Sequence, residues 1–300
     1  MSNDSLRRFF FGPSRRTGKK SKSVQLQVEG LEERRTPVSA NWNVVDGVLT
    51  VSGSGQPFVN DRILLRQSGS LLEVIDMRSG FPVIVQIGGS PSDPSGRTIN
   101  TSVVTGILVD GGPGNDLIDL NSTAAGFASI TISATLVGGS GSDSLAGGDG
   151  NDSIVGGDNP DLIFGNEGND TIDGGTFNDI IFGSAGDDSI LGGSGEDLIT
   201  GNDGNDFIDG GDGNDSILGL TGADTLLGGL GNDTLRGGDN ADSMVGGGND
   251  DFLFGELGTD ILYGDDTAGG GSGNDFLRGD QQDDSLIGGG GNDSMLGIDG

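Results

Sequence analysis

An aspartate recurs every nine residues through the middle of this chain, and this fixed spacing limits the folds that the chain can adopt. Between residues 137 and 263 no insertion interrupts the period, and Leu, Ile or Met stands two positions after every aspartate. The fourteen aspartates of this array are Asp143, Asp152, Asp161, Asp170, Asp179, Asp188, Asp197, Asp206, Asp215, Asp224, Asp233, Asp242, Asp251 and Asp260. The same pattern surrounds Asp116 before the array and Asp275, Asp284 and Asp293 after it. A constant period of this kind predicts similar units stacked on one another.

Each nine-residue unit is expected to divide into a turn and a strand. The unit at 147–155 reads Gly-Gly-Asp-Gly-Asn-Asp-Ser-Ile-Val. Its first six residues favour a tight turn, because Gly, Asn and Asp tolerate positive φ angles. Its last three predict a strand whose middle side chain points inward, because neighbouring side chains of a strand face opposite sides. Two units, eighteen residues, should therefore make one coil, and the coils should build two parallel sheets around a narrow aliphatic core.

The stacking predicts a need for cations. Equivalent aspartates of successive coils would lie about 4.8 Å apart, where like charges repel. A divalent cation between them reverses the sign of the interaction and also binds turn carbonyls that lack partners. Calcium fits best, since it accepts six to eight oxygens in flexible geometry, whereas Mg²⁺ retains its waters and requires a stricter octahedron.

These residues resemble the repeats-in-toxin (RTX), or hemolysin-type, calcium-binding nonapeptide repeat. The resemblance covers more than half of the chain and implies an all-β fold, a right-handed parallel β-roll with eighteen residues per coil. It implies Ca²⁺ ions between successive turns, held by turn carbonyls and by the eighteen aspartates named above. Four turns depart from the pattern, at Asn159-Pro160, Phe177, Asn240-Ala241 and Asn249-Asp250, which predicts less regular sites there.

The charge of the chain agrees with this interpretation. Region 137–300 contains 34 acidic residues and two basic ones, Arg236 and Arg278, so its formal charge is −32 within a chain of −31. We expect an expanded chain without cations, because one aliphatic per nine residues does not offset ordering entropy and this repulsion. Nucleic acid is excluded as a partner by the same repulsion. The sequence has no Cys and no His, which excludes disulfides and a histidine-based zinc protease.

Residues 1–39 are expected to be a basic, disordered, export-associated arm. They hold nine of the fifteen basic residues. Only Phe9-Phe10-Phe11 precedes Gly12-Pro13, which is too short for the apolar core of an ordinary cleaved signal peptide. The tract from Leu31 to Pro37, Leu-Glu-Glu-Arg-Arg-Thr-Pro, resembles one near the N-terminus of some large bacterial exported or surface proteins. The alternatives are an arm that stays in solvent and an arm that docks on the acidic roll.

The rest of the chain divides into three predicted parts. Alternating apolar residues predict a β-rich cap or degenerate solenoid coils at 40–110. A first repeat and a strand-like insertion occupy 111–136, and the β-roll occupies 137–300, with an insertion at 265–270 expected to bulge at one edge. The chain stops partway through a unit, which predicts a truncated reading frame or an array that normally continues. No apolar run approaches the eighteen residues of a membrane span.

The pattern favours a calcium-binding structural or binding module, secreted from or attached to a bacterial cell, over an enzyme. A working acid and base pair needs two unlike environments, whereas the repeated turns predict equivalent ones. The alternative is the noncatalytic RTX repeat portion of a larger secreted hydrolase or pore-forming toxin. A disordered glycine-rich chain is a further alternative. Disorder would not require an aliphatic residue at the same position of every nine-residue unit, so the pattern disfavours it. An ice-binding solenoid needs a regular Thr or Asx ladder, whereas the third turn position varies among Asp, Ser, Thr, Leu and Glu.

One outward face of the predicted roll is unusually apolar. The residues that flank the inward aliphatics of alternate units point outward and stack on successive coils. In one row these include Leu162, Phe164, Ile180, Phe182 and Leu198. Such patches usually mark contacts, which predicts self-association or docking to a surface partner through these five residues. Coverage by the N-terminal arm or cap is the alternative.

Overall fold

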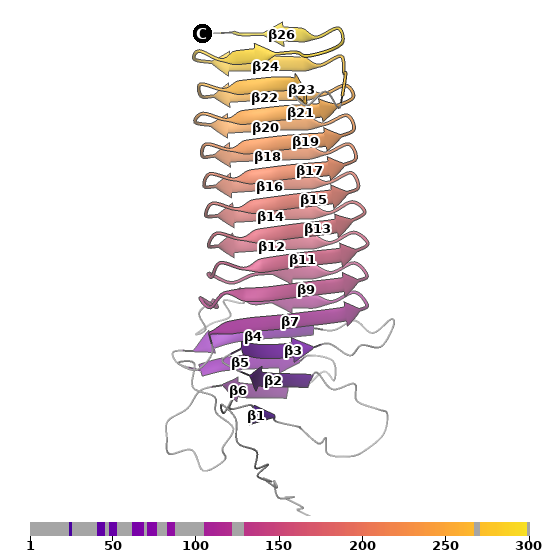
Figure 1. Ribbon diagram of the computed structural model, residues 1–300. Helices are drawn as coiled ribbons and strands as arrows, with labels where there is room; N and C mark the ends of the chain where they lie inside the picture. Colours follow the sequence, from indigo (N-terminus) through magenta and orange to yellow (C-terminus); the bar gives the residue numbers. More distant parts are fainter. Residues whose placement is uncertain are drawn as a thin grey trace, which may run out of the picture.

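The computed structural model describes residues 105–121, 129–266 and 271–298, together with the backbone of six strands nearer the N-terminus (Figure 1). The expected disordered arm therefore lies outside the described residues, apart from one two-residue strand. Among the described residues no helix is long and apolar enough to cross a membrane. The boundaries of the N-terminal parts stay predictions. The strand Gly106–Pro113 extends across the predicted boundary between the cap, which ends at residue 110, and the first repeat.

The described residues form two sheets of thirteen strands each. Sheet A contains, in spatial order, β1 (Val24–Gln25), β2 (Asn41–Val45), β3 (Val48–Ser52), β7 (Gly106–Pro113), β9 (Ala134–Ser140), β11 (Ser153–Asp158), β13 (Thr171–Thr176), β15 (Ser189–Ser194), β17 (Phe207–Asp212), β19 (Thr225–Leu230), β21 (Ser243–Gly248), β23 (Ile261–Asp265) and β25 (Ser285–Ile287). Sheet B contains β6 (Val83–Ile87), β5 (Leu71–Asp76), β4 (Arg62–Ser68), β8 (Leu117–Asp119), β10 (Ser144–Ala146), β12 (Leu162–Glu167), β14 (Ile180–Ala185), β16 (Leu198–Asp203), β18 (Ser216–Thr221), β20 (Thr234–Asp239), β22 (Phe252–Leu257), β24 (Phe276–Gln281) and β26 (Ser294–Leu296).

The strands of each sheet are parallel and in register across the repeat. Ile154 pairs with Ile172 in sheet A, and Leu145 pairs with Ile163 in sheet B, each pair eighteen residues apart. The chain alternates between the sheets as it climbs, and forms a right-handed coil (Figure 1). This arrangement confirms the predicted parallel β-roll. At its N-terminal end β3 and β4 join the parallel stack, whereas β2, β5 and β6 pair antiparallel.

The strands are longer than the sequence pattern predicted. The expected three-residue strand is wrong, because most strands of the array span six residues, such as Ser153–Asp158. The first three residues of the predicted turn still pair with the next coil, as Gly157 does with Gly175 and Asp158 with Thr176. Each real turn is therefore only three residues long, and the strands fill most of the coil.

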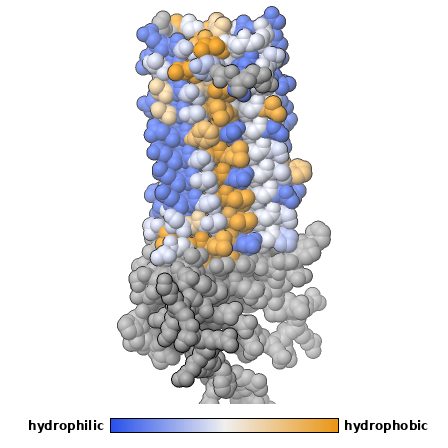
Figure 2. Space-filling view, in the orientation of Figure 1, coloured by the Kyte–Doolittle hydropathy of each residue, from blue (hydrophilic) through white to orange (hydrophobic). Residues whose placement is uncertain are grey.

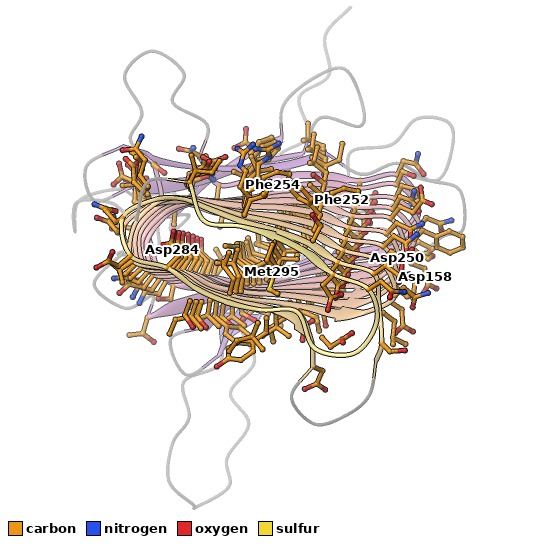
Figure 3. The ribbon with its side chains drawn as sticks, turned by 90° about the horizontal axis from the view of Figure 1, so that it is seen from above. Asp158, Asp250, Phe252, Phe254, Asp284 and Met295 are labelled. Atoms are coloured by element: carbon orange, nitrogen blue, oxygen red, sulfur yellow. The ribbon has the colours of Figure 1, made fainter. Side chains whose placement is uncertain are left out.

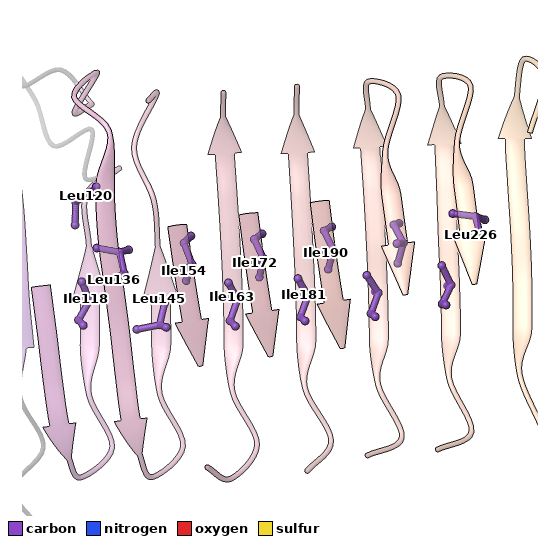
Figure 4. Close-up of a cluster of buried hydrophobic side chains, with 14 of the residues drawn as sticks. Ile118, Leu120, Leu136, Leu145, Ile154, Ile163, Ile172, Ile181, Ile190 and Leu226 are labelled. Atoms are coloured by element: carbon purple, nitrogen blue, oxygen red, sulfur yellow. The ribbon is translucent and has the colours of Figure 1, made fainter. Parts of the chain in front are cut away.

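The core is a single column of aliphatic side chains between the sheets (Figure 4). Ile154, Ile163, Ile172 and Ile181 follow one another with at most 1% of each side chain exposed. Burying one such side chain stabilises the fold by about 1.5–3 kcal/mol, which matches the entropy lost by fixing only one or two residues. Backbone hydrogen bonds and the groups in the turns must therefore supply much of the stability.

Two positions of most turn regions adopt left-handed backbone conformations. They are the second and fourth residues of the unit, as at Gly175 with φ 106° and Gly186 with φ 131°. The departures from the glycine pattern keep this shape, since Phe177 has φ 74° and Asn240 has φ 78°. Non-glycine residues cost roughly 1–2 kcal/mol in this conformation. The irregular turns thus retain the backbone geometry of the regular ones.

Candidate metal centre

The repeated aspartates form two rows inside the roll, because each stands immediately before a strand and the strands stack. Row A leads into sheet A and contains Asp152, Asp170, Asp188, Asp206, Asp224, Asp242, Asp260 and Asp284. Row B leads into sheet B and contains Asp116, Asp143, Asp161, Asp179, Asp197, Asp215, Asp233, Asp251, Asp275 and Asp293. The structure thus brings all eighteen predicted residues into two continuous series.

A ladder of hydrogen bonds connects the members of each row. The main-chain N–H of one aspartate donates to Oδ1 of the aspartate one coil further on, as from Asp170 to Asp188 at 2.8 Å. The ladder continues past the insertion before residue 271, where Asp251 donates to Asp275 at 3.0 Å. Seen along the roll axis, row A ends at Asp284 near one narrow end of the flattened coil (Figure 3).

The second oxygen of most of these carboxylates is buried without a partner. Oδ2 has no hydrogen-bond partner in fourteen of them: Asp143, Asp161, Asp170, Asp179, Asp188, Asp197, Asp206, Asp215, Asp224, Asp233, Asp242, Asp251, Asp260 and Asp275. All fourteen side chains are at most 4% exposed. Leaving a buried acceptor unsatisfied costs about 1–3 kcal/mol, and more if it is charged. A cation would satisfy these oxygens.

The first glycine of each unit leaves room beside the orphaned oxygen. A Cβ atom placed on Gly156 would lie 2.5 Å from Oδ2 of Asp161 and 2.5 Å from the carbonyl oxygen of Gly174. A carboxylate oxygen and a main-chain carbonyl oxygen therefore converge over a backbone without a side chain, and the same arrangement recurs from coil to coil. Any side chain here would fill the space that these oxygens share.

Burial makes the charged form of the aspartates unfavourable. Desolvation raises the pKa of Asp170 to about 8, against the lowering effect of the N–H of Asp152, and the charges of Asp152 and Asp188 raise it further. The same causes raise the pKa of Asp161 to about 7 and that of Asp251 to about 8. Without a cation the rows would therefore hold many protons near neutral pH, because positive charge is lacking around them.

Asp152 differs from the other members of its row. Both of its oxygens have donors: the N–H of Ala134 lies 2.7 Å from Oδ1, and the N–H of Gly148 lies 2.8 Å from Oδ2. Row A begins here, since Ala134 occupies the place of an aspartate in the preceding coil. The bond from Gly148 is what distinguishes Asp152, because Oδ1 of the next member of the row, Asp170, likewise accepts an N–H from the preceding coil.

A second ladder runs along the outside of the turns, and the sequence analysis missed it. The fifth residue of many units is Asn, Asp or Glu, and its side-chain oxygen accepts the N–H of the equivalent residue one coil on. Asn169 donates to Asn151 at 3.1 Å, and Asn205 donates to Asp187 at 2.8 Å. This ladder points opposite to the inner one. The recurrence of Asn and Asp at the fifth position of the units was the sequence signal that could have predicted this ladder.

The donor set is suited to a hard cation. Within the described parts of the chain, no three acidic side chains converge on one point, so backbone carbonyls would have to complete any coordination shell. Carboxylate and carbonyl oxygens are the ligands that calcium prefers, whereas Cys and His, favoured by zinc, do not occur in the sequence. The residues present thus fit calcium.

Comparison with known families gives a match over the same region. A family model described as the RTX calcium-binding nonapeptide repeat (4 copies) matches residues 133–163, 164–199, 200–235, 236–268 and 269–297, together more than half of the chain. A search among curated proteins found no match. The matched segments contain both aspartate rows except Asp116.

Proposed function

The chain belongs to the RTX calcium-binding nonapeptide repeat family, and on this premise we propose that it is a noncatalytic module that folds on binding Ca²⁺ outside the cell. The observation that carries the proposal is the pair of rows of buried carboxylates with unpartnered Oδ2 atoms. Such groups are unfavourable in an ion-free roll, and calcium compensates them.

Seventeen of the eighteen predicted aspartates are the proposed side-chain ligands, because Asp152 has donors for both of its oxygens. Main-chain carbonyls such as that of Gly174 complete the shell. Each ion supplies two positive charges to a region of formal charge −32. Binding stabilises only the coiled state, so the free energies of the separate sites add to the stability of one cooperative fold. Calcium should therefore act as a folding switch.

The equivalence of the aspartates supports a structural role over catalysis. Desolvation raises the pKa of Asp179, Asp206, Asp215 and Asp242 alike, to about 7. An acid and base pair needs pKa values that are pushed apart. The same module could serve as the noncatalytic repeat portion of a larger secreted hydrolase or toxin, which a longer gene product would reveal.

An extracellular location is part of the proposal, because calcium is millimolar outside cells and far scarcer within them. A chain that needs calcium to fold would stay expanded in the cytoplasm and fold after export. The surface of Leu162, Phe164, Ile180, Phe182 and Leu198 would then mediate self-association or contact with a surface partner.

A calcium titration of the full chain tests the folding switch. Far-UV circular dichroism should change from a disordered to a β spectrum as Ca²⁺ is added, with a sigmoidal dependence, and excess chelator should reverse the change. Equal concentrations of Mg²⁺ should not produce it. A β spectrum that chelator leaves unchanged contradicts the proposal.

A matched pair of variants tests the assigned ligands. Asp206→Asn removes one charge from row A, and Asp203→Asn removes one charge from an exposed position three residues earlier. The first should raise the calcium midpoint, the Ca²⁺ concentration at which half of the chains are folded, several-fold. It should also lower the number of ions bound, measured by titration calorimetry. The second should leave the number of bound ions unchanged. Equal effects would show that net charge alone, and not row A, governs binding.

A further inference from the structure

Two columns of outward-facing residues on sheet B are free of acidic residues over seven successive coils. The first and third residues of each strand from β12 to β24 point outward, and none of these fourteen is Asp or Glu. Both arginines of the roll, Arg236 and Arg278, stand among them. On sheet A the corresponding column is interrupted by Asp173 and Asp209, and its face in Figure 2 alternates between apolar and hydrophilic residues. In a region of charge −32, these two columns have thus been kept uncharged or basic.

Aromatic contacts organise the two ends of this face. Near the N-terminal end Phe164 stacks on Phe182, with ring centroids 5.1 Å apart and planes at 7°. Near the C-terminal end Phe254 lies between two guanidinium groups, with Arg236 at 4.4 Å and Arg278 at 5.0 Å from its ring centroid. Figure 3 shows Phe252 and Phe254 projecting from the outer side of their layer.

The arginines retain local partners, which keeps this face close to neutral. Arg236 pairs with Glu256 at 3.0 Å, and Arg278 pairs with Asp280 at 2.8 Å. Both acidic partners belong to strands of sheet B, where they stand two residues beyond the second of the two columns. A partner that docks on these columns therefore meets apolar surface and guanidinium groups whose charge is neutralised by Glu256 and Asp280.

The sequence of the face is complementary to itself when reversed about β18. Phe182 and Phe254 lie two coils from Leu218, on opposite sides of it. Phe164 and Arg278 lie three coils from it, again on opposite sides. In the neighbouring column Ile180 matches Phe252. A half-turn about an axis along β18 would therefore place Phe182 against Phe254, and Phe164 against Arg278, of a second copy. The first contact is aromatic and the second is of the cation–π type.

We propose that this face is the interface of an antiparallel, two-fold symmetric dimer of the calcium-folded roll. The inference rests on the folding switch proposed above, because the face exists only when the coils stack. Seven coils span about 29 Å at about 4.8 Å per coil. With a width of about 15 Å, the interface would bury roughly 900 Å² in total, below the usual range for stable complexes. The dimer is therefore a weak, concentration-dependent one.

Sedimentation velocity of the full chain in saturating Ca²⁺ measures the association, with circular dichroism as the check that each protein has folded. The wild-type chain should form dimers at tens of micromolar concentration. Phe164→Ser with Phe182→Ser at one end, or Phe252→Ser with Phe254→Ser at the other, should raise the dimer dissociation constant at least tenfold. The control pair Leu191→Ser with Phe207→Ser, on sheet A and 40% and 44% exposed, should change it less than twofold.

Cysteine cross-linking tests the antiparallel geometry, since the native chain has no cysteine. In a mixture of the variants Leu162→Cys and Phe276→Cys, the antiparallel dimer forms disulfides between the two different chains. A parallel dimer instead links like chains. Links between like chains overturn the geometry, and a strictly monomeric wild type at 100 µM, folded in Ca²⁺, overturns the interface. A chain that fails to fold in Ca²⁺ instead contradicts the proposed folding switch.

Discussion

The main-chain N–H of Asp188 donates a 2.9 Å hydrogen bond to Oδ1 of Asp206, while Oδ2 of Asp206 lies buried without a hydrogen-bond partner. One oxygen is thus held by the preceding coil, which fixes the orientation of the carboxylate, and the other is left for a ligand that protein groups do not supply. The roll repeats this division of roles along both rows.

Asp206→Ala and Asp242→Ala should raise the calcium midpoint by similar factors. The sequence predicted a less regular site at Asp242, but the structure gives both side chains 2% exposure and an N–H donor at 2.8–2.9 Å. Each substitution leaves a buried N–H without its acceptor, at a cost of about 1–3 kcal/mol. Calcium titrations followed by circular dichroism compare the two. A clearly smaller shift for Asp242→Ala would instead support the sequence-based prediction that irregular turns form weaker sites.

Asp152→Asn should leave the number of bound calcium ions unchanged, whereas Asp170→Asn should reduce it. Both oxygens of Asp152 already accept main-chain hydrogen bonds, so its carboxylate is satisfied without an ion. Oδ2 of Asp170 has no such donor. Calorimetric stoichiometry at saturating Ca²⁺ distinguishes them. Equal loss of bound ions in the two variants would mean that the first coil of row A binds calcium like the others.

Acid should favour the calcium-free roll. Desolvation raises the pKa of Asp233 from 3.8 to about 6 and that of Asp170 to about 8. A group whose folded pKa is raised stabilises the fold fully below its unfolded pKa, and this contribution is lost as pH rises through the folded pKa. In calcium-free buffer, β structure should therefore decrease between pH 5 and pH 8.

The calcium concentration at the midpoint of folding should also decrease as pH rises, because protons compete with calcium for the same carboxylates. It should rise as pH falls from 8 to 5. Circular dichroism across this range, with and without calcium, measures both trends. A calcium-free β signal that grows with increasing pH would contradict the raised pKa values.

Leu220→Gly should stabilise the roll, whereas Leu191→Gly should destabilise it. Both leucines are 40% exposed, but Leu220 has φ 82° and Leu191 lies in the regular part of β15. Relief of the left-handed strain at Leu220, roughly 1–2 kcal/mol, exceeds the roughly 0.5–1 kcal/mol cost of added chain entropy. Thermal unfolding in saturating Ca²⁺ should show melting temperatures that move apart. A loss of stability at both positions would contradict this account.

Much of the fold follows from the sequence, because the period of nine determines which residues repeat in space. The inward column of Ile, Leu and Met was predicted residue by residue, since each member stands two positions after an aspartate. The length of the strands was not predicted. Gly157 and Asp158 have turn chemistry but pair with the next coil, because strand pairing continues wherever a stacked neighbour offers matching groups.

The site could be predicted as a set of residues but not as an arrangement of atoms. The repeat identified the aspartates, yet it did not show that Oδ1 accepts the N–H of the preceding coil. It also did not show that Oδ2 of Asp152 accepts the N–H of Gly148. Such contacts depend on the positions of individual atoms, which the spacing of residues in the sequence does not determine.

The uninterrupted period between Asp143 and Asp251 makes the roll a molecular ruler. Equivalent residues eighteen positions apart in the sequence are separated by one coil, about 4.8 Å along the axis, as the pairing of Phe164 with Phe182 shows. Distances along the surface are therefore proportional to differences in residue number. Groups attached to chosen positions of one column would be displayed at fixed intervals in a straight line, and adding or removing pairs of units would change the length of the molecule in equal steps.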